Sequence, residues 1–247
     1  MGTLLVLAAV AGAWALSSGV REPDISSYYP LEVGNSWSYE TKQYGKLVGP
    51  TGVEESEKTG TIEQRVLGAS RLSSEQLKVF KVRQKTEELA PDGTSLPARE
   101  SVLHVSATPS AVSLQALESD GSESPALPAP VPILTDPPSE DEVVITSGAV
   151  QVLVTVQSQE VEAVEVPAGS YPKALKKVAG GPVTGEVSGV PVSSGSMTET
   201  TWFVRDVGIV KQERRFEMLV QGPAGSELRI EERSQRDLTK FTPGTAN

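Results

Sequence analysis

The chain contains no cysteine and a single histidine, His104, among its 247 residues. The absence of cysteine excludes disulfide bonds, thiolate metal sites and a lipid-modified cysteine. One histidine is too few for a metal centre built from several imidazoles. We therefore expect no metal site of these kinds and no cofactor.

Basic side chains are also scarce. Lys and Arg number 22 against 32 Asp and Glu, so the formal net charge is −10 at pH 7. Proteins that bind nucleic acid without regard to sequence use many Lys and Arg side chains, because these must neutralise phosphates. We therefore expect no nucleic-acid partner.

An apolar run near the N-terminus predicts export. The run, Leu4–Ala15, ends in the small-x-small pattern Ala13-Trp14-Ala15, which is typical of a secretory signal peptide. It is shorter than the ~20 apolar residues that span a bilayer, so we expect no stable transmembrane anchor. No Lys or Arg precedes Arg21, which is atypical of a signal peptide, and a buried helix is the alternative. We expect a signal peptide over 1–15 and a periplasmic or extracellular location.

Apolar and polar residues alternate through much of the remaining sequence. This period of two predicts strands with one buried and one solvated face. In Val150–Val156, for example, every second residue is valine, and turn residues such as Pro91-Asp92-Gly93 separate such segments. We expect an all-β fold with one curved antiparallel sheet or an incomplete barrel, and little helix. The predicted strands are Ser36–Tyr44, Thr61–Leu67, Leu77–Lys85, Glu100–Ser106, Ala111–Leu117, Val150–Val156, Ala174–Val178, Thr198–Arg205, Gly208–Val220 and Leu228–Glu232.

Three segments interrupt this pattern. Residues 118–142 carry six prolines and no Lys or Arg, and proline removes a backbone donor, so we expect a solvated loop. The glycine-rich run Ala179–Gly195 predicts a flexible, wide hairpin tip, and Ser70–Gln76 one short helical turn. The predicted organisation is a polar tether over 16–27, a single β domain over 28–242 that the Pro-rich acidic loop 118–142 interrupts, and a tail over 243–247.

No catalytic motif is recognisable. A serine nucleophile needs a base, and His104, inside an apolar strand pattern, is the one imidazole available. Glu160 and Glu162 share a strand face and could act as paired carboxylates on a sugar, but an ordinary exposed strand face has the same pattern. We expect that the protein is not an enzyme. A hydrolase acting on sugars or esters is the least favoured alternative.

Aromatic residues are few, with 3 Trp, 5 Tyr and 4 Phe, but several share strands. Large aromatic side chains dominate either cores or ligand pockets. Core filling is the favoured interpretation. The functional alternative is a hydrophobic cavity inside a curved sheet that holds a lipid-like ligand and is lined by Trp37, Tyr39, Phe80 and Trp202.

Three phrases of the sequence resemble those of a known family. Tyr28–Tyr39 resembles an opening phrase YPL-x-x-G-x-x-W-x-Y, Val166–Tyr171 matches VPAG-x-aromatic, and Thr201–Lys211 is similar to W-aromatic followed by VG-L-V-K. The family is the TapB or DUF3108-like group of exported bacterial envelope proteins of unknown function. The resemblance implies an antiparallel sheet, of the half-barrel kind seen in periplasmic lipoprotein carriers such as LolA. It implies no catalytic residue, and the missing cysteine departs from the lipoprotein members.

Two functional hypotheses follow. The first is an exported, non-enzymatic envelope protein that binds an apolar or lipid-like ligand. The second is a structural or assembly component that contacts an envelope protein through exposed sheet edges.

Overall fold

The structure is a computed structural model that describes residues 24–71, 77–119, 126–138, 142–147, 149–221 and 226–245. The predicted signal peptide at 1–15, most of the tether at 16–27 and most of Ser70–Gln76 lie outside these ranges. The described elements are η1 (Ile25–Tyr28), β1 (Ser36–Gly49), β2 (Gly52–Arg71), β3 (Lys78–Leu89), β4 (Arg99–Thr108), β5 (Ala111–Ser119), β6 (Ala126–Thr135), β7 (Val143–Ser147), β8 (Val150–Val166), β9 (Gly169–Val187), β10 (Val190–Val204), β11 (Gly208–Gln221) and β12 (Glu227–Thr242).

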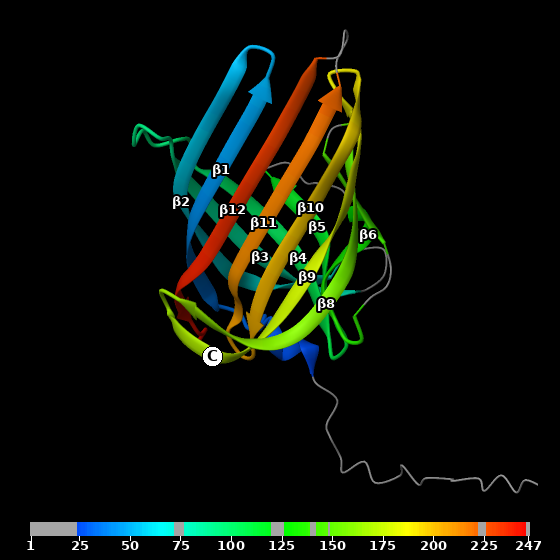
Figure 1. The fold of residues 1–247 in the computed structure, drawn as a ribbon. Helices are drawn as coiled ribbons and strands as arrows, with labels where there is room; N and C mark the ends of the chain where they lie inside the picture. Colours follow the sequence, from blue (N-terminus) through cyan, green and yellow to red (C-terminus); the bar gives the residue numbers. More distant parts are fainter. Residues whose placement is uncertain are drawn as a thin grey trace, which may run out of the picture.

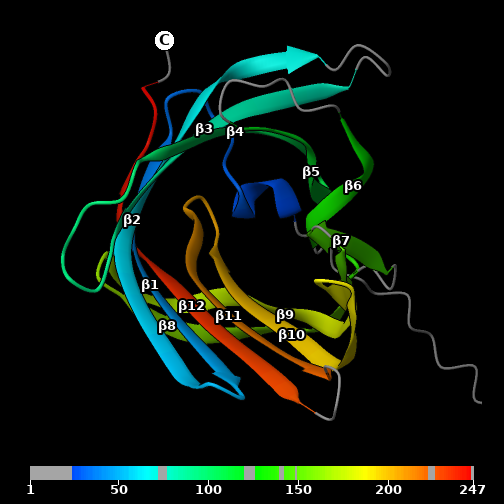
Figure 2. The same ribbon diagram turned by 90° about the horizontal axis from the view of Figure 1, so that it is seen from above.

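All these strands belong to one antiparallel sheet that curls into a barrel (Figures 1 and 2). The strand order is β6-β5-β4-β3-β2-β1-β12-β11-β10-β9-β8-β7. The first and last strands therefore pair in the middle of the sheet, and its edges are β6 and β7. Among the described residues no backbone ladder joins these two edges, so the barrel keeps one open seam. The predicted all-β, curved antiparallel fold with little helix is confirmed.

The end of the barrel that holds η1 is packed with apolar side chains. Residues paired across strands share a face of the sheet, and the register places Ile62, Tyr39 and Leu238 in one row. Tyr39 and Leu238 are 1% and 0% exposed, and Phe203 of β10 joins the same core. Figure 2 shows η1 inside the ring of strands. We call this the η1 end, and the opposite end, where β1 turns into β2, the hairpin end.

Two buried aromatic side chains at the η1 end have hydrogen-bond partners for their polar atoms. Trp37 donates its indole N–H to the Val207 carbonyl and stacks on Phe241 at a ring distance of 5.7 Å. Tyr39 donates its hydroxyl to the Ile209 carbonyl over 3.0 Å. Burial raises the pKa of Tyr39, so the phenol stays protonated and can donate. These bonds join β1 to the start of β11 and remove the cost of burying the polar tips.

The segment 118–142, predicted to be a loop, contains the strand β6. It pairs with β5, with Val112 opposite Leu134, and Leu134 is 1% exposed. The loop prediction is wrong for Ala126–Thr135, because proline is excluded from central strands but not from edge strands. At an edge, the missing N–H need not join a second ladder.

The chain enters the fold earlier than predicted. Asp24 accepts a hydrogen bond from the backbone N–H of Ser26 and caps η1, and Ile25 donates its N–H to the Pro109 carbonyl. Ile25 is buried in the core. Residues 24–27 are therefore not part of a tether, because the apolar Ile25 side chain fills the barrel mouth.

Ala179–Gly195 is not a wide flexible tip. β9 continues to Val187 and β10 begins at Val190, so a two-residue turn joins them. Ser188 and Gly189 both have positive φ, 53° and 79°, as a type I′ turn requires, and this turn suits the twist of paired strands.

We expect Leu238→Ala to lower the free energy of unfolding by about 2–5 kcal/mol, because it opens a cavity in the core of the η1 end. Leu67→Ala is the matched control, since Leu67 is 46% exposed and its truncation leaves no cavity. Urea denaturation of both variants measures the difference. Equal losses in the two would contradict the position of the core.

Candidate functional site

A row of polar side chains crosses the inner face directly beyond the aromatic core. On β1, β12, β11 and β10 the member lies two residues from a core residue, as Thr41 lies two residues after Tyr39, so the row also faces inward. The register aligns it across β1, β12, β11, β10, β9 and β8. We call it the polar row, and it consists of Thr41, Arg236, Gln212, Thr201, Lys177 and Gln159.

Arg236 lies at the centre of the polar row. Its guanidinium carbon is 5.1 Å from the ring centre of Tyr39, within the range of a cation–π contact. Its Nε is buried and has no hydrogen-bond partner among the described residues. Beside it, Gln212 donates its amide to the Thr201 hydroxyl over 3.3 Å. A buried donor without an acceptor is costly, and a bound ligand is one way to satisfy it.

Lys177 and Gln159, at the end of the polar row, bridge the open seam. The Lys177 ammonium donates to the Ile133 carbonyl of β6 over 2.6 Å, and the Gln159 amide to the Thr135 carbonyl over 3.2 Å. Lys177 is buried, and this desolvation lowers its pKa. Side chains thus satisfy carbonyls of β6 at the seam, where no backbone ladder does.

Nearer the hairpin end, the inner face of β8 to β12 becomes apolar again. Met197, Met218 and Val220 are buried there, and Phe216 and Ile230 are partly buried beside them. We call this set the inner apolar patch: Val152, Val183, Met197, Phe216, Met218, Val220, Leu228 and Ile230. The inner wall therefore changes from an apolar core to a polar row and back to an apolar surface.

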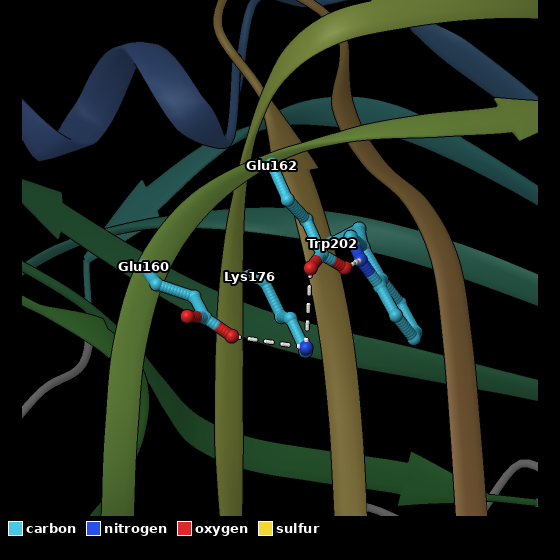
Figure 3. Close-up of polar contacts among 4 residues, drawn as sticks. All are labelled: Glu160, Glu162, Lys176 and Trp202. Atoms are coloured by element: carbon cyan, nitrogen blue, oxygen red, sulfur yellow. Dashed lines mark hydrogen bonds and ion pairs between the residues drawn. The ribbon is translucent and has the colours of Figure 1, made fainter.

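The two carboxylates proposed as a catalytic pair are both bound to one lysine (Figure 3). The Lys176 ammonium contacts Glu160 Oε1 at 3.0 Å and Glu162 Oε2 at 3.2 Å. Trp202 donates its indole N–H to Glu162 over 2.6 Å, and this bond, with Lys176, holds the pKa of Glu162 below its usual value. A general acid needs the opposite shift. The arrangement is that of an ion-pair ladder on the sheet.

His104 lies elsewhere, on β4. Its Nε2 is 2.5 Å from a carboxylate oxygen of Glu118 on β5, and this contact lowers the pKa of Glu118. β4 and β8 are far apart in the strand order, and no described contact joins His104 to Glu160 or Glu162. The structure does not bring the three candidate catalytic residues together.

The four predicted cavity-lining residues all belong to the core cluster or pack against it. Trp37, Tyr39 and Trp202 are buried members of this core, and Phe80 is partly buried beside it. Phe80 lines a groove of about 730 Å³ at the η1 end, beside Tyr29 and Leu31. Trp202 pairs with Lys211, whose ammonium is 5.0 Å from its ring, on the face of β10 opposite Phe203 and Thr201. Contact of any of the four with a ligand stays a prediction.

The polar row was not predicted from the sequence. Its position on β1 could have been inferred locally, because Trp37, Tyr39 and Thr41 occupy every second position of that strand and so share a face. The other members come from strands far away in the sequence, and only the register aligns them.

The described residues include no group of three or more His, Asp or Glu that could hold a metal ion. They also include no helix that is long and apolar enough to span a membrane.

No family model matches the chain, and no curated protein matches it. Among solved structures, the chain is similar to an S-type phycobiliprotein lyase from Guillardia theta, with 12% sequence identity and a TM-score of 0.33. The alignment covers 88% of this chain and 94% of the lyase. A similarity at this TM-score carries no argument about function. The resemblance to the TapB or DUF3108-like family stays a prediction.

We expect the stability contributed by Lys177 to rise with pH. Because burial lowers its pKa, the folded state releases the proton before the unfolded state does, and stability rises from the lowered pKa up to about 10.4, the unperturbed value. The difference in unfolding free energy between wild type and Lys177→Met should therefore increase between pH 7 and pH 10, as measured by urea denaturation.

Lys176→Met is the matched control, on the same strand and the opposite face. Hydrogen bonds to Glu160 and Glu162 raise the pKa of Lys176, so its contribution is constant over this range and is lost only at higher pH. A flat profile for Lys177→Met would show that its ammonium is not desolvated.

Proposed function

We propose that the protein is a binding protein whose barrel holds a small lipid-like ligand on its inner face. The observation that supports this is the amphipathic inner wall, on which the polar row lies between the core and the inner apolar patch. Within this wall the buried Arg236 Nε has no hydrogen-bond partner among the described residues, and a ligand oxygen could accept its hydrogen bond. An amphipathic ligand matches both parts of this surface.

The ligand would lie beyond the aromatic core rather than inside it. Tyr39 and Phe203 are each 1% exposed, so the protein's own side chains already fill the η1 end. Several members of the inner apolar patch, Phe216, Leu228 and Ile230 among them, are only partly buried, so an alkyl chain could contact them. This position differs from a site lined by Trp37 and Tyr39.

We also propose that the protein acts outside the cytoplasm as an envelope protein. The support is the apolar run Leu4–Ala15 and its small-x-small end. Mass spectrometry of the protein recovered from the periplasm or the medium tests this, because cleavage after residue 15 lowers the mass by that of residues 1–15. Full-length protein that stays in the cytoplasm would contradict export.

An assembly role is the second candidate, and the edge strand β7 favours it. Val144 and Ile145 are 54% and 41% exposed, and one edge of β7 has no strand partner among the described residues. Such an edge can accept a strand of another protein. If Val144→Lys abolished a complex seen by light scattering, assembly would be supported. A wild-type monomer without crosslinked partners would contradict it.

We expect Phe216→Ser to weaken the binding of 1-decanol by about tenfold or more, because a buried Phe side chain contributes about 1.5–3 kcal/mol. Isothermal titration calorimetry measures this. Leu219→Ser is the control, because Leu219 lies on the same strand with the opposite orientation. Equal weakening by both variants, or no binding by the wild type, would contradict the proposed site.

A further inference from the structure

A second row of inward-facing side chains lies two residues from the polar row toward the hairpin end, and it contains two basic residues. On the β10 side of this row, the register places Glu199 opposite Arg214. The register pairs Lys58 of β2 with Gln43 of β1, Gln43 with Ser234 of β12, and Ser234 with Arg214 of β11. We call Lys58, Gln43, Ser234 and Arg214 the basic row. Gln43, Ser234 and Arg214 each lie two residues from a member of the polar row, and Lys58 is paired with Gln43, so all four share the inner face.

The basic row borders a small hollow. A groove of about 170 Å³ is lined by all four of its members and by Gly45, Ser56 and Glu232 of the next row, with Tyr44 and Arg233 at its margin. Gly45 lines this hollow, and a Cβ at this position would lie 2.9 Å from the Ser56 hydroxyl, so a larger residue would require Ser56 to shift. The volume suits a compact polar group rather than an alkyl chain.

Neither cation of the basic row is neutralised. Among the described residues, the side chains of Lys58 and Arg214 make no hydrogen bond and no ion pair. Glu232, in the same groove, and Glu199, opposite Arg214 on β10, pair with neither cation. Two lysines elsewhere on β1 and β11 do form ion pairs with carboxylates. Lys46 lies 3.0 Å from Glu55 and Lys211 lies 2.8 Å from Glu213.

We infer that the hollow between Lys58 and Arg214 is an anion site that holds the phosphate or carboxylate head group of an amphipathic ligand. The inference rests on the proposed function and names the chemical class of its ligand. Arg binds such oxyanions through two parallel N–H bonds and Lys binds them as a point charge. The Ser234 hydroxyl adds a neutral donor between them, whereas the Gln43 amide donates to Glu88 Oε1 over 3.3 Å.

The inner apolar patch lies in the right place for the tail. On β11, Phe216 and Met218 follow Arg214 at intervals of two residues, so all three share the inner face. Phe216 is opposite Glu232, and Met218 is opposite Ile230. A head group over the basic row therefore places an alkyl chain along the inner apolar patch.

The experiment compares three probes by isothermal titration calorimetry: decyl phosphate, 1-decanol and inorganic phosphate. Wild type should bind decyl phosphate at least tenfold more tightly than 1-decanol. The double variant Lys58→Gln/Arg214→Gln should weaken decyl phosphate binding by about tenfold or more and leave 1-decanol binding unchanged. Gly45→Val, which keeps both charges but fills the hollow, should also weaken decyl phosphate binding.

Lys42→Gln/Arg215→Gln is the matched control. It removes the same two charges from the neighbouring positions of β1 and β11, which face away from the hollow, and it should bind decyl phosphate as the wild type does. Circular dichroism and thermal melting check that each variant is folded.

The outcomes separate the two proposals. Equal affinity for decyl phosphate and 1-decanol, or equal weakening by the test and control double variants, overturns the anion site and leaves the binding function intact. Inorganic phosphate that binds as tightly as decyl phosphate supports the anion site but contradicts a lipid-like ligand. No binding of any probe overturns both.

Discussion

The pairing of β1 with β12 fixes the alignment on which every inner row of this barrel depends. These are the first and last strands of the chain, and they meet near the middle of the sheet, with Tyr39 opposite Leu238 and Thr41 opposite Arg236. A slip of one residue would turn the aromatic side chains outward and bring the charged side chains into the core. The Trp37 stack on Phe241 and the bond from Tyr39 to Ile209 lock this register at the η1 end.

β2 extends further toward the hairpin end than its neighbour β3, and this difference explains why the inner wall is packed with apolar side chains at the η1 end and carries polar ones beyond it. β2 runs from Gly52 to Arg71, but its pairing with β3 begins only at Thr59. Beyond that point the β1–β2 hairpin continues without this neighbour, as Figure 1 shows. Side chains at the η1 end therefore have a wall opposite them and pack as a core. Lys58 comes one residue after this limit toward the hairpin end, and polar side chains are tolerated there because they remain solvated.

Local patterns in the sequence predicted the strands but not their neighbours. All ten predicted strands overlap described strands, because alternation marks a half-buried strand wherever it occurs. β6 was missed because its prolines indicate a loop unless the strand is known to be at an edge. The polar and basic rows could not be predicted, because each joins residues from up to six strands. Trp202 and Phe203 show the same limit, since adjacent residues face opposite sides and the pattern alone does not say which side is the inside.

Glu162, one of the two carboxylates considered as catalytic, and Glu118, the partner of His104, both bind basic side chains. Glu162 and Glu118 both have lowered pKa values, caused first by donated hydrogen bonds from Trp202 and His104. They therefore stay charged near neutral pH and cannot supply protons. Lys58 and Arg214 are two of the cations that form no ion pair among the described residues, and both face inward over one hollow. An anionic ligand would complete at this place the pairing that carboxylates provide at Lys46 and Lys176.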